Sequence, residues 1–348
     1  MPPFNVITAH QIAQLDPVCW DALNGDQPFS SYRWHQFGEH VLHEDTPCYI
    51  VLMRDGQPAA RATFWITRRE VLPTDMIRWP GVAGAFFRRW PLMPCRAPLT
   101  PASSLILPAD KSLHPTALET LSETARSIAR QHHVSFLFFD YLEAPLTGLR
   151  GYGSLDMAEP GTELAIQWAD FDSYLSSLKK SAYKDYRRHA NRAADLGISM
   201  TVLPLNAETV VPDVEQAIRL IQNVDRAHNS PSHPYMRRAL EQAHHGTTSF
   251  IAARIGDRLV GCGLMLRDGD HAMLSLLGLD YDVEYVYFQL FYAAVRTAIE
   301  TGVKVLWGGS GAYEYKERFG FQKQHKTTVT FTASNRLVGN VMQTLLSR

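Results

Sequence analysis

The sequence predicts an α+β protein built from two tandem domains, each a mostly antiparallel sheet flanked by helices. The first observation is length, since 348 residues is more than the roughly 150 residues of a typical domain. The second is a repeated order of elements: helices, an antiparallel meander, a helix and one more strand occur in each half. The composition, 45% hydrophobic and 20% charged, is that of a folded globular chain. We place the domains at residues 1–168 and 169–348.

The second half contains the clearer copy of this order. Its meander is predicted as three strands within residues 248–280, because Gly256-Asp257 and Asp268-Gly269 supply hairpin turns. Apolar residues then recur at helical spacing, and Gly302 is a suitable helix end. The other elements predicted here are strands at 198–205 and 303–307, a glycine-rich turn, a short helix, and a last strand of this domain at 326–333.

The first half repeats the order more loosely. A hairpin within residues 48–72 turns at Asp55-Gly56, and residues 117–133 form an amphipathic pattern. A buried strand follows at 134–143, and the stretch 162–168 is predicted to close the first domain. Residues 78–105 fit neither copy, and their Pro and Trp content predicts a long ordered loop.

Charge and cysteine content narrow the class of protein. With 34 basic and 35 acidic residues, a globally basic nucleic-acid binder is not expected, whereas a local basic face is compatible with the composition. The four cysteines, Cys19, Cys48, Cys95 and Cys262, have no CxxC spacing, so neither a disulfide framework nor a zinc site is expected. No signal peptide and no apolar run of about 20 residues is evident. We expect a cytoplasmic protein without a membrane span.

The glycine-rich stretch "GGSGAYEYKERFG", residues 308–320, is the strongest candidate for chemistry. A nucleophile elbow around Ser310 would need glycine where Ala312 stands, and its triad would need an acid and then a histidine further along; after Ser310 the chain has one histidine, His325, and no aspartate. A P-loop is excluded because the chain has no GxxxxGK[ST] motif. The remaining feature is the pair Tyr315-Lys316, which would place an ammonium near backbone N–H donors. Such a group stabilises an oxyanion or a leaving phosphate, although a solvated lysine beside a core tyrosine is the alternative.

This stretch and the order of elements resemble the FemABX-like proteins, which form amide bonds and consist of duplicated GNAT acyltransferase domains. Gly308, Gly309, Tyr315, Lys316 and Gly320 carry the match. Two further stretches also resemble that family: "QPFSSYRWHQFGEH" near the start, and the basic helix "LKKSAYKDYRRHANRAADLGI". The resemblance implies that Lys316 acts in the transfer step with Tyr315 as its positioning neighbour, and that tRNA delivers an aminoacyl group. The turn would add substrate-binding residues, namely Gly308, Gly309, Ser310, Gly311 and Tyr313.

A second candidate region is "DYDVEYVYFQ", residues 280–289. Asp280, Asp282 or Glu284 would be the general base that deprotonates an acceptor amine, with Asp282 and Glu284 preferred. Tyr285, Tyr287 and Gln289 would line an acyl pocket. The loop contains no glycine and three acids, so it should repel the CoA pyrophosphate that GNAT domains bind at this position. The alternative is that these acids are merely exposed.

The basic helix is the third candidate. Lys180, Lys184, Arg187 and Arg188 fall within one third of the helix circumference at about 100° per residue. They would form a phosphate track for the donor, or equally an ordinary solvated face. No metal centre is expected, because the histidines lack HExxH spacing.

Together these features predict an amide-forming transferase that moves an acyl or aminoacyl group to an amine acceptor. Attack is expected to be direct, since no cysteine or serine has a convincing nucleophile setting. The donor, a co-substrate rather than a bound cofactor, is an aminoacyl-tRNA or a CoA- or carrier-bound acyl group, so tRNA or an acyl-carrier protein is the expected partner. Two alternatives stay open: a plain acyl-CoA or acyl-carrier N-acyltransferase, and a non-catalytic binding protein for an anionic ligand. The oligomeric state is not predicted.

Overall fold

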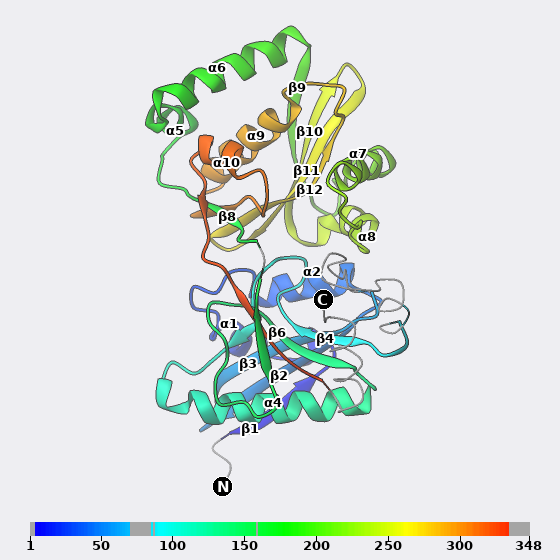
Figure 1. The fold of residues 1–348 in the computed structure, drawn as a ribbon, viewed down its shortest axis with the longest axis vertical. Helices are drawn as coiled ribbons and strands as arrows, with labels where there is room; N and C mark the ends of the chain where they lie inside the picture. The colour runs from blue at the N-terminus through cyan, green and yellow to red at the C-terminus, as the bar shows by residue number, and fades with distance from the viewer. Residues whose placement is uncertain (1–3, 70–84, 86–87, 158, 334–348) are drawn as a thin grey trace. The chain divides into compact units, whose positions relative to one another are not determined.

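The computed structural model describes residues 4–69, 85, 88–157 and 159–333 and divides the chain into two compact units. Unit 1 comprises Met1–Ala158 and Lys326–Arg348, and unit 2 comprises Glu159–His325. Each unit contains one mixed sheet with helices packed on it (Figure 1). Within the described parts of the chain, no helix is both long and apolar enough to cross a membrane.

Unit 1 is built on a sheet with the strand order β1-β2-β3-β4-β6-β15-β7, and β5 pairs with β3 beside this path. Most neighbours are antiparallel, but β4 and β6 are parallel. The helices and strands of unit 1 are α1 Pro17–Asp21, α2 Tyr32–Val41, α4 His114–Gln131, β1 Asn5–Ala9, β2 Thr46–Arg54, β3 Gln57–Ile66, β4 Leu92–Cys95, β5 Leu105–Ile106, β6 Phe136–Leu142, β7 Gly153–Asp156 and β15 Thr328–Ala333.

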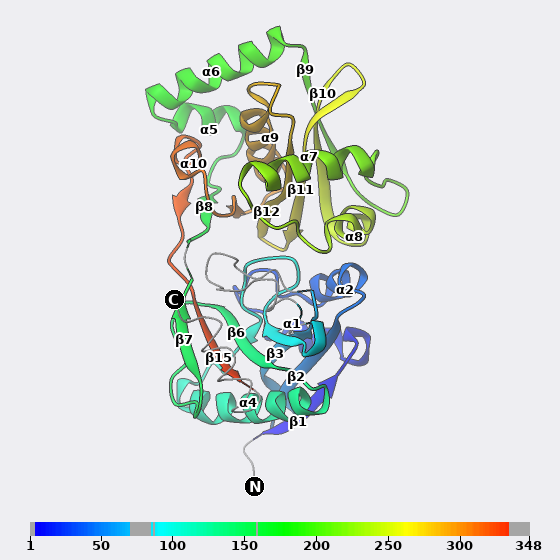
Figure 2. The same cartoon turned by 45° about the vertical axis from the view of Figure 1, so that its right-hand side comes forward.

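The core of unit 1 lies between this sheet and α4, which runs along one face of it (Figures 1 and 2). Ala117, Leu121 and Ala125 recur at helical spacing and are fully buried in the cluster that includes the sheet residues. The predicted hairpin at Asp55-Gly56 is confirmed, since both residues adopt positive φ at the β2–β3 turn.

The stretch "QPFSSYRWHQFGEH" anchors α2 in unit 1. The Ser31 hydroxyl caps the helix by accepting from the Trp34 N–H at 3.0 Å. Immediately before it, the carbonyl oxygen of Ser30 accepts from the buried Arg61 guanidinium at 2.8 Å and from the Trp20 indole at 3.0 Å. The residues of this sequence match therefore stabilise the start of α2 and its packing in unit 1.

Unit 2 has a sheet with the order β14-β8-β13-β12-β11-β10-β9. The pairs are antiparallel except for β12 and β13. Its elements are α5 Phe171–Ser177, α6 Lys180–Asp195, α7 Val214–Ala227, α8 Met236–Glu241, α9 Val286–Glu300, α10 Tyr313–Arg318, β8 Thr162–Ala165, β9 Ile198–Pro204, β10 Thr247–Ile255, β11 Arg258–Asp268, β12 His271–Leu279, β13 Val305–Trp307 and β14 Gln322–Lys323.

Helices α7 and α9 cover opposite faces of the unit 2 sheet (Figures 1 and 2). A side chain on Gly261 would collide with Val286 of α9, whereas the next residue, Cys262, points its thiol toward the α7 backbone. Successive strand residues face opposite sides of a sheet, so this alternation places one helix on each face. The predicted meander and its two turns are confirmed as β10, β11 and β12.

Strands β12 and β13 pair only over a short distance. Their parallel register joins His271–Met273 to Val305–Trp307. Beyond this point β12 continues to Leu279, whereas β13 ends at Trp307 and the chain enters the glycine-rich turn. The edge of β12 after Met273 thus has no strand partner on the β13 side within the described residues, and the turn begins where the two strands part.

The structure corrects two features of the predicted domain organisation. The stretch 162–168, expected to close the first domain, forms β8 and pairs with β13 in unit 2. The stretch 326–333, expected to end the second domain, forms β15 and pairs with β6 and β7 in unit 1. The division therefore falls at residues 158/159 and 325/326 rather than at 168/169, because the chain returns to the first sheet after unit 2. Order along the chain places each of these strands with its nearest neighbours in sequence, whereas the sheets pair them with distant ones.

The sheets are mostly antiparallel, as predicted, and each also contains one parallel pair, β4 with β6 in unit 1 and β12 with β13 in unit 2. Part of the predicted loop 78–105 lies outside the described residues. Its later portion is not a loop throughout, because Leu92–Cys95 forms β4, whose four residues are buried.

Candidate functional site

The glycine-rich turn connects β13 to α10 and is tied to β8. The Gly308 N–H donates to the Thr162 carbonyl oxygen at 2.8 Å, and the Thr162 hydroxyl donates to the Gly309 carbonyl oxygen at 2.8 Å. A Cβ on Gly308 would lie 2.9 Å from side-chain atoms of Phe321 and Thr162, so only glycine fits there. Gly309 and Gly311 adopt positive φ, a conformation that glycine takes without strain.

Lys316 is buried beneath this turn. Its side chain comes from α10, the residue is 4% exposed, and Nζ donates to the carbonyl oxygens of Gly309 at 3.1 Å and Ser310 at 2.8 Å. Nζ also lies 6.0 Å from the centre of the Phe291 ring. The sequence correctly suggested that the lysine and the turn meet. It was wrong in placing the ammonium near N–H donors, since carbonyl oxygens face it.

Burial alters the acid–base behaviour of Lys316. Desolvation lowers its pKa from 10.5 to about 8, and the Glu159 carboxylate opposes that shift. An ammonium group has three N–H donors, and the two carbonyl oxygens occupy two of them. No acceptor for the third is found among the described residues, so the arrangement holds one directed donor on a group with a pKa of about 8.

Tyr315 and Tyr313 lie beside Lys316 on α10 but differ in their surroundings. Tyr315 is 49% exposed, and its ring meets those of Tyr287 and Phe288 at centroid distances of 6.2 and 5.7 Å. The Tyr313 hydroxyl instead donates to the Pro160 carbonyl oxygen at 2.8 Å. Tyr313 therefore ties α10 to the start of unit 2, while Tyr315 presents an aromatic surface next to the buried ammonium.

The first turn of α9 contributes the other predicted pocket residues. Tyr285 precedes the helix with a left-handed φ of 69°, and its side chain makes no capping hydrogen bond. This conformation is strained for a bulky residue. The Tyr287 hydroxyl and the Gln289 side-chain nitrogen are buried without a hydrogen-bond partner among the described residues. Burial also raises the pKa of Tyr287. Unsatisfied buried polar atoms are uncommon and consistent with a site that binds a polar ligand.

The acidic residues of this loop are not brought to Lys316 by any contact within the described structure. Asp280 forms an ion pair with Arg258, and its other oxygen accepts from the Asp282 N–H at 3.1 Å. Asp282 and Glu284 are exposed. A role for either as general base remains a prediction.

Helix α6 presents the predicted basic residues to solvent, where Lys180, Lys184, Arg187 and Arg188 are all exposed. One of them, Arg188, has a carboxylate partner that was not predicted. Asp185 accepts from Arg188 at 2.8 Å and from Arg318 of α10 at 2.9 Å. The ion pair of Asp185 and Arg188 could have been predicted from their i,i+3 spacing in the sequence. The ion pair of Arg318 with Asp185 depends on how α10 packs against α6, so nothing in the sequence signals it.

His189, also missed, connects α6 to α9. The residue is 4% exposed, and its ring stacks on that of Phe288 at a centroid distance of 3.8 Å. Its Nε2 lies 3.5 Å from an Arg188 nitrogen, while the buried Nδ1 has no partner among the described residues. Burial, reinforced by Arg188, lowers the pKa of His189, which favours the neutral ring.

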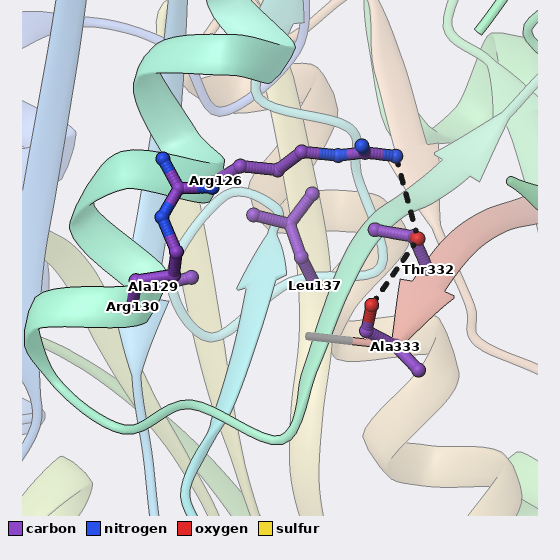
Figure 3. A pocket seen from close by; sticks show the side chains of 6 residues that line it. All are labelled: Arg126, Ala129, Arg130, Leu137, Thr332 and Ala333. Carbon is purple, nitrogen blue, oxygen red and sulfur yellow. Dashed lines mark hydrogen bonds between the residues drawn. The ribbon is translucent and has the colours of Figure 1, made fainter. Parts of the chain in front are cut away.

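A small cavity is found elsewhere, in unit 1, on the side of α4 (Figure 3). Arg126 extends across it to donate to the Thr332 hydroxyl at 3.5 Å and to the Arg150 carbonyl oxygen at 2.7 Å. The guanidinium thereby links α4 to β15 and to the loop before β7. None of the predicted site residues lines this cavity, whose lining residues are Arg126, Ala129, Arg130, Leu137, Thr332 and Ala333.

Comparison with solved structures supports the fold. The structure of FemX superposes with a TM-score of 0.64 at 11% identity, covering 97% of this chain and 100% of that one. A tandem GNAT protein from the clavulanic acid biosynthesis pathway gives 0.53 at 13% identity, with 95% and 99% covered. L-PGS from Bacillus licheniformis gives 0.53 at 10% identity, with 96% and 98% covered.

Comparison of the sequence with curated proteins finds no match. A family model does match, however, over residues 11–347. It is the FemAB-like model, described as peptidoglycan biosynthesis/recognition. Because this match spans nearly the whole chain, the protein belongs to the FemAB-like family.

Proposed function

We propose that the protein is an amide-forming transferase that moves an aminoacyl group from aminoacyl-tRNA to an amine acceptor. The observation that carries the proposal is Lys316: a buried amine held by two carbonyl oxygens, with one donor left over and a pKa lowered to about 8. Membership of the FemAB-like family and the tandem GNAT fold support acyl or aminoacyl transfer in general.

In the proposed reaction the acceptor nitrogen attacks the carbonyl carbon of the donor ester. A C–N bond forms and the C–O bond to the RNA breaks. The remaining N–H of the Lys316 ammonium first stabilises the developing oxyanion and then gives its proton to the leaving oxygen. The attacking nitrogen releases one proton to solvent, and Lys316 regains one from solvent. Protons therefore balance over the cycle without an enzyme-bound acyl group.

Two features favour an RNA donor over CoA. The loop before α9 carries exposed acids at Asp282 and Glu284, which disfavour a pyrophosphate at that helix terminus. Helix α6 offers a row of exposed cations suited to backbone phosphates, and the exposed ring of Tyr315 offers a surface on which a base can stack.

The family description, peptidoglycan biosynthesis/recognition, favours an amine of a cell-wall peptide as acceptor. The acceptor would meet the donor carbonyl near Lys316 and the unpaired Tyr287 hydroxyl. The Tyr287 hydroxyl would then hydrogen-bond the aminoacyl group.

The test is transfer of a radiolabelled amino acid from mixed aminoacyl-tRNA to a panel of peptide amines, with acetyl-CoA as a parallel donor. We expect labelled amide from tRNA with the native protein and loss of the product with Lys316→Met. Amide formation from acetyl-CoA alone would reject the RNA donor. Binding of tRNA without turnover on any acceptor would favour the non-catalytic alternative.

A further inference from the structure

One carboxylate holds two arginines that come from different helices of unit 2. Asp185 of α6 accepts from Arg188 of the same helix at 2.8 Å through one oxygen and from Arg318 of α10 at 2.9 Å through the other. The Asp185 side chain is only 18% exposed, whereas those of Arg188 and Arg318 are 59% and 57% exposed. The group thus carries a net positive charge and presents two guanidinium groups to solvent.

Most of the donors of these guanidinium groups remain available. Each guanidinium carries five N–H donors in a planar fork, and the contacts with Asp185 use one nitrogen of each. A planar fork matches the oxygen spacing of a phosphate. Two arginines fixed side by side therefore form an arrangement suited to one oxyanion.

The position of Arg188 is further supported by the core. His189 stacks on Phe288 of α9 and brings Nε2 to within 3.5 Å of Arg188. The lowered pKa of His189 keeps Nε2 able to accept. The charged groups that act on this ring are Arg188, Asp185 and Arg318 themselves. Arg188 is thus positioned by a contact with the buried His189 as well as by its ion pair with Asp185.

We infer that Arg188 and Arg318, oriented by Asp185, bind a phosphate of the acyl donor. This pair is called the arginine clamp below. The inference rests on the proposed function, and it adds the residues that would position the donor. Arg318 follows Lys316 by two residues on α10, and α6, α9 and α10 lie on the same side of the unit 2 sheet (Figures 1 and 2). A phosphate in the clamp would therefore hold the donor against the helix that carries Lys316.

Phosphate is shared by two donor types, so the test uses two probes: a short single-stranded RNA with the CCA end of tRNA, and CoA. Affinity is measured against salt for the native protein, Arg188→Gln and Arg318→Gln. We expect each variant to bind the RNA roughly tenfold more weakly. The slope of log K against log salt should fall by about 0.7 for each lost phosphate contact. Arg219→Gln, which removes an exposed arginine from α7, is the matched control and should bind as the native protein does.

Asp185→Asn tests whether Asp185 orients the two arginines or only neutralises part of their charge. If the carboxylate only neutralised its neighbours, its removal would add net positive charge and strengthen RNA binding. The clamp predicts the opposite sign, weaker binding, because the arginines lose their common acceptor. Asp185→Glu should restore part of the affinity. Thermal melting of each variant checks that unit 2 remains folded.

The outcomes distinguish the clamp from the proposed function. The clamp is overturned if the native protein binds RNA and neither arginine variant weakens that binding. It is also overturned if Asp185→Asn strengthens the binding. In both cases the proposal of an RNA donor is unaffected. Binding of CoA but not RNA, lost in both arginine variants, keeps the clamp and rejects the RNA donor. Binding of neither probe by the native protein overturns the clamp and removes the support for a phosphate-bearing donor.

Discussion

Lys316 and Thr162 donate to the same atom, the carbonyl oxygen of Gly309, at 3.1 and 2.8 Å. One donor lies on α10 and the other on β8, nearly the full length of unit 2 apart in sequence. The shared acceptor fixes the position of the amine relative to the sheet, because a tight turn with two donors on one carbonyl has little freedom to shift. This arrangement makes Lys316 a directed group rather than a mobile surface cation.

The first prediction concerns the Lys316 side chain itself. Lys316→Met keeps the length and apolar character of the side chain but removes the ammonium. We expect the rate of transfer at saturating donor to fall about 10²–10³-fold, as when an oxyanion donor is lost, with little change in the donor KM. The measurement is steady-state transfer from aminoacyl-tRNA.

Lys304→Met is the control for this change, since it removes an exposed lysine that pairs with Asp270. It should leave the transfer rate within twofold or so of native, as for a surface ion pair. Equal losses in both variants would show that charge, and not the position of Lys316, determines the rate.

The second prediction is the pH dependence of transfer. The proposed role needs the ammonium form, and burial lowers the pKa of Lys316 to about 8. As pH rises through that value the side chain loses its proton, so transfer should decline above pH 8 by up to about tenfold per unit. The profile is measured as kcat at saturating acceptor, which suppresses the titration of the acceptor amine.

A rate that rises through pH 8 and then levels would reverse this assignment. It would mean that the neutral Lys316 amine accepts the proton of the attacking nitrogen. The two-carbonyl geometry would still apply, with a lone pair in place of the third N–H.

The third prediction tests the shared carbonyl. Thr162→Val removes the hydroxyl from a residue only 2% exposed while keeping its shape. Loss of one buried hydrogen bond should lower the free energy of unfolding by about 1 kcal/mol. It should also reduce kcat several-fold, because Gly309 is less firmly held.

Thr162→Ser keeps the hydroxyl and should restore most of the rate even if the missing methyl group lowers stability. Chemical denaturation gives the stability and single-turnover transfer gives the rate. Equal rates for valine and serine variants would show that the Thr162 hydrogen bond does not position Lys316.

Local patterns in the sequence predicted most elements of unit 2, because the turns at Gly256-Asp257 and Asp268-Gly269 and the spacing of apolar residues in α9 are local signals. The exchange of β8 and β15 between sheets was not predictable in this way. Both are short strands of ordinary composition, and their partners are set by packing far along the chain. The same reason applies to the candidate site. The sequence predicted the proximity of Lys316 and the glycine-rich turn because they are neighbours in the chain. It did not predict the contact between Arg318 and Asp185, because these residues lie on separate helices.

The fourth prediction concerns acid stability and the buried His35 in unit 1. Its ring lies between the Ser31 carbonyl oxygen at 3.1 Å and the Ser104 hydroxyl at 3.3 Å. Burial first, and then the nearby Arg61 cation, lower the pKa of His35 from 6.5 to about 3. The unfolded chain therefore takes up a proton below pH 6.5 while the folded chain does not. Stability is full above that pH and is lost as pH falls toward 3.

The size of this effect follows from linkage. At 1.36 kcal/mol per pKa unit, the shift corresponds to roughly 5 kcal/mol lost across the whole window as an upper limit. Urea denaturation at a series of pH values measures the loss, and His35→Gln, which cannot titrate, should flatten the dependence between pH 6 and about 4. Should that variant fail to fold, the NMR titration of His35 in the native protein decides instead. A ring that protonates near pH 6 would contradict the buried neutral state, whereas a ring that stays neutral to about pH 4 would confirm it.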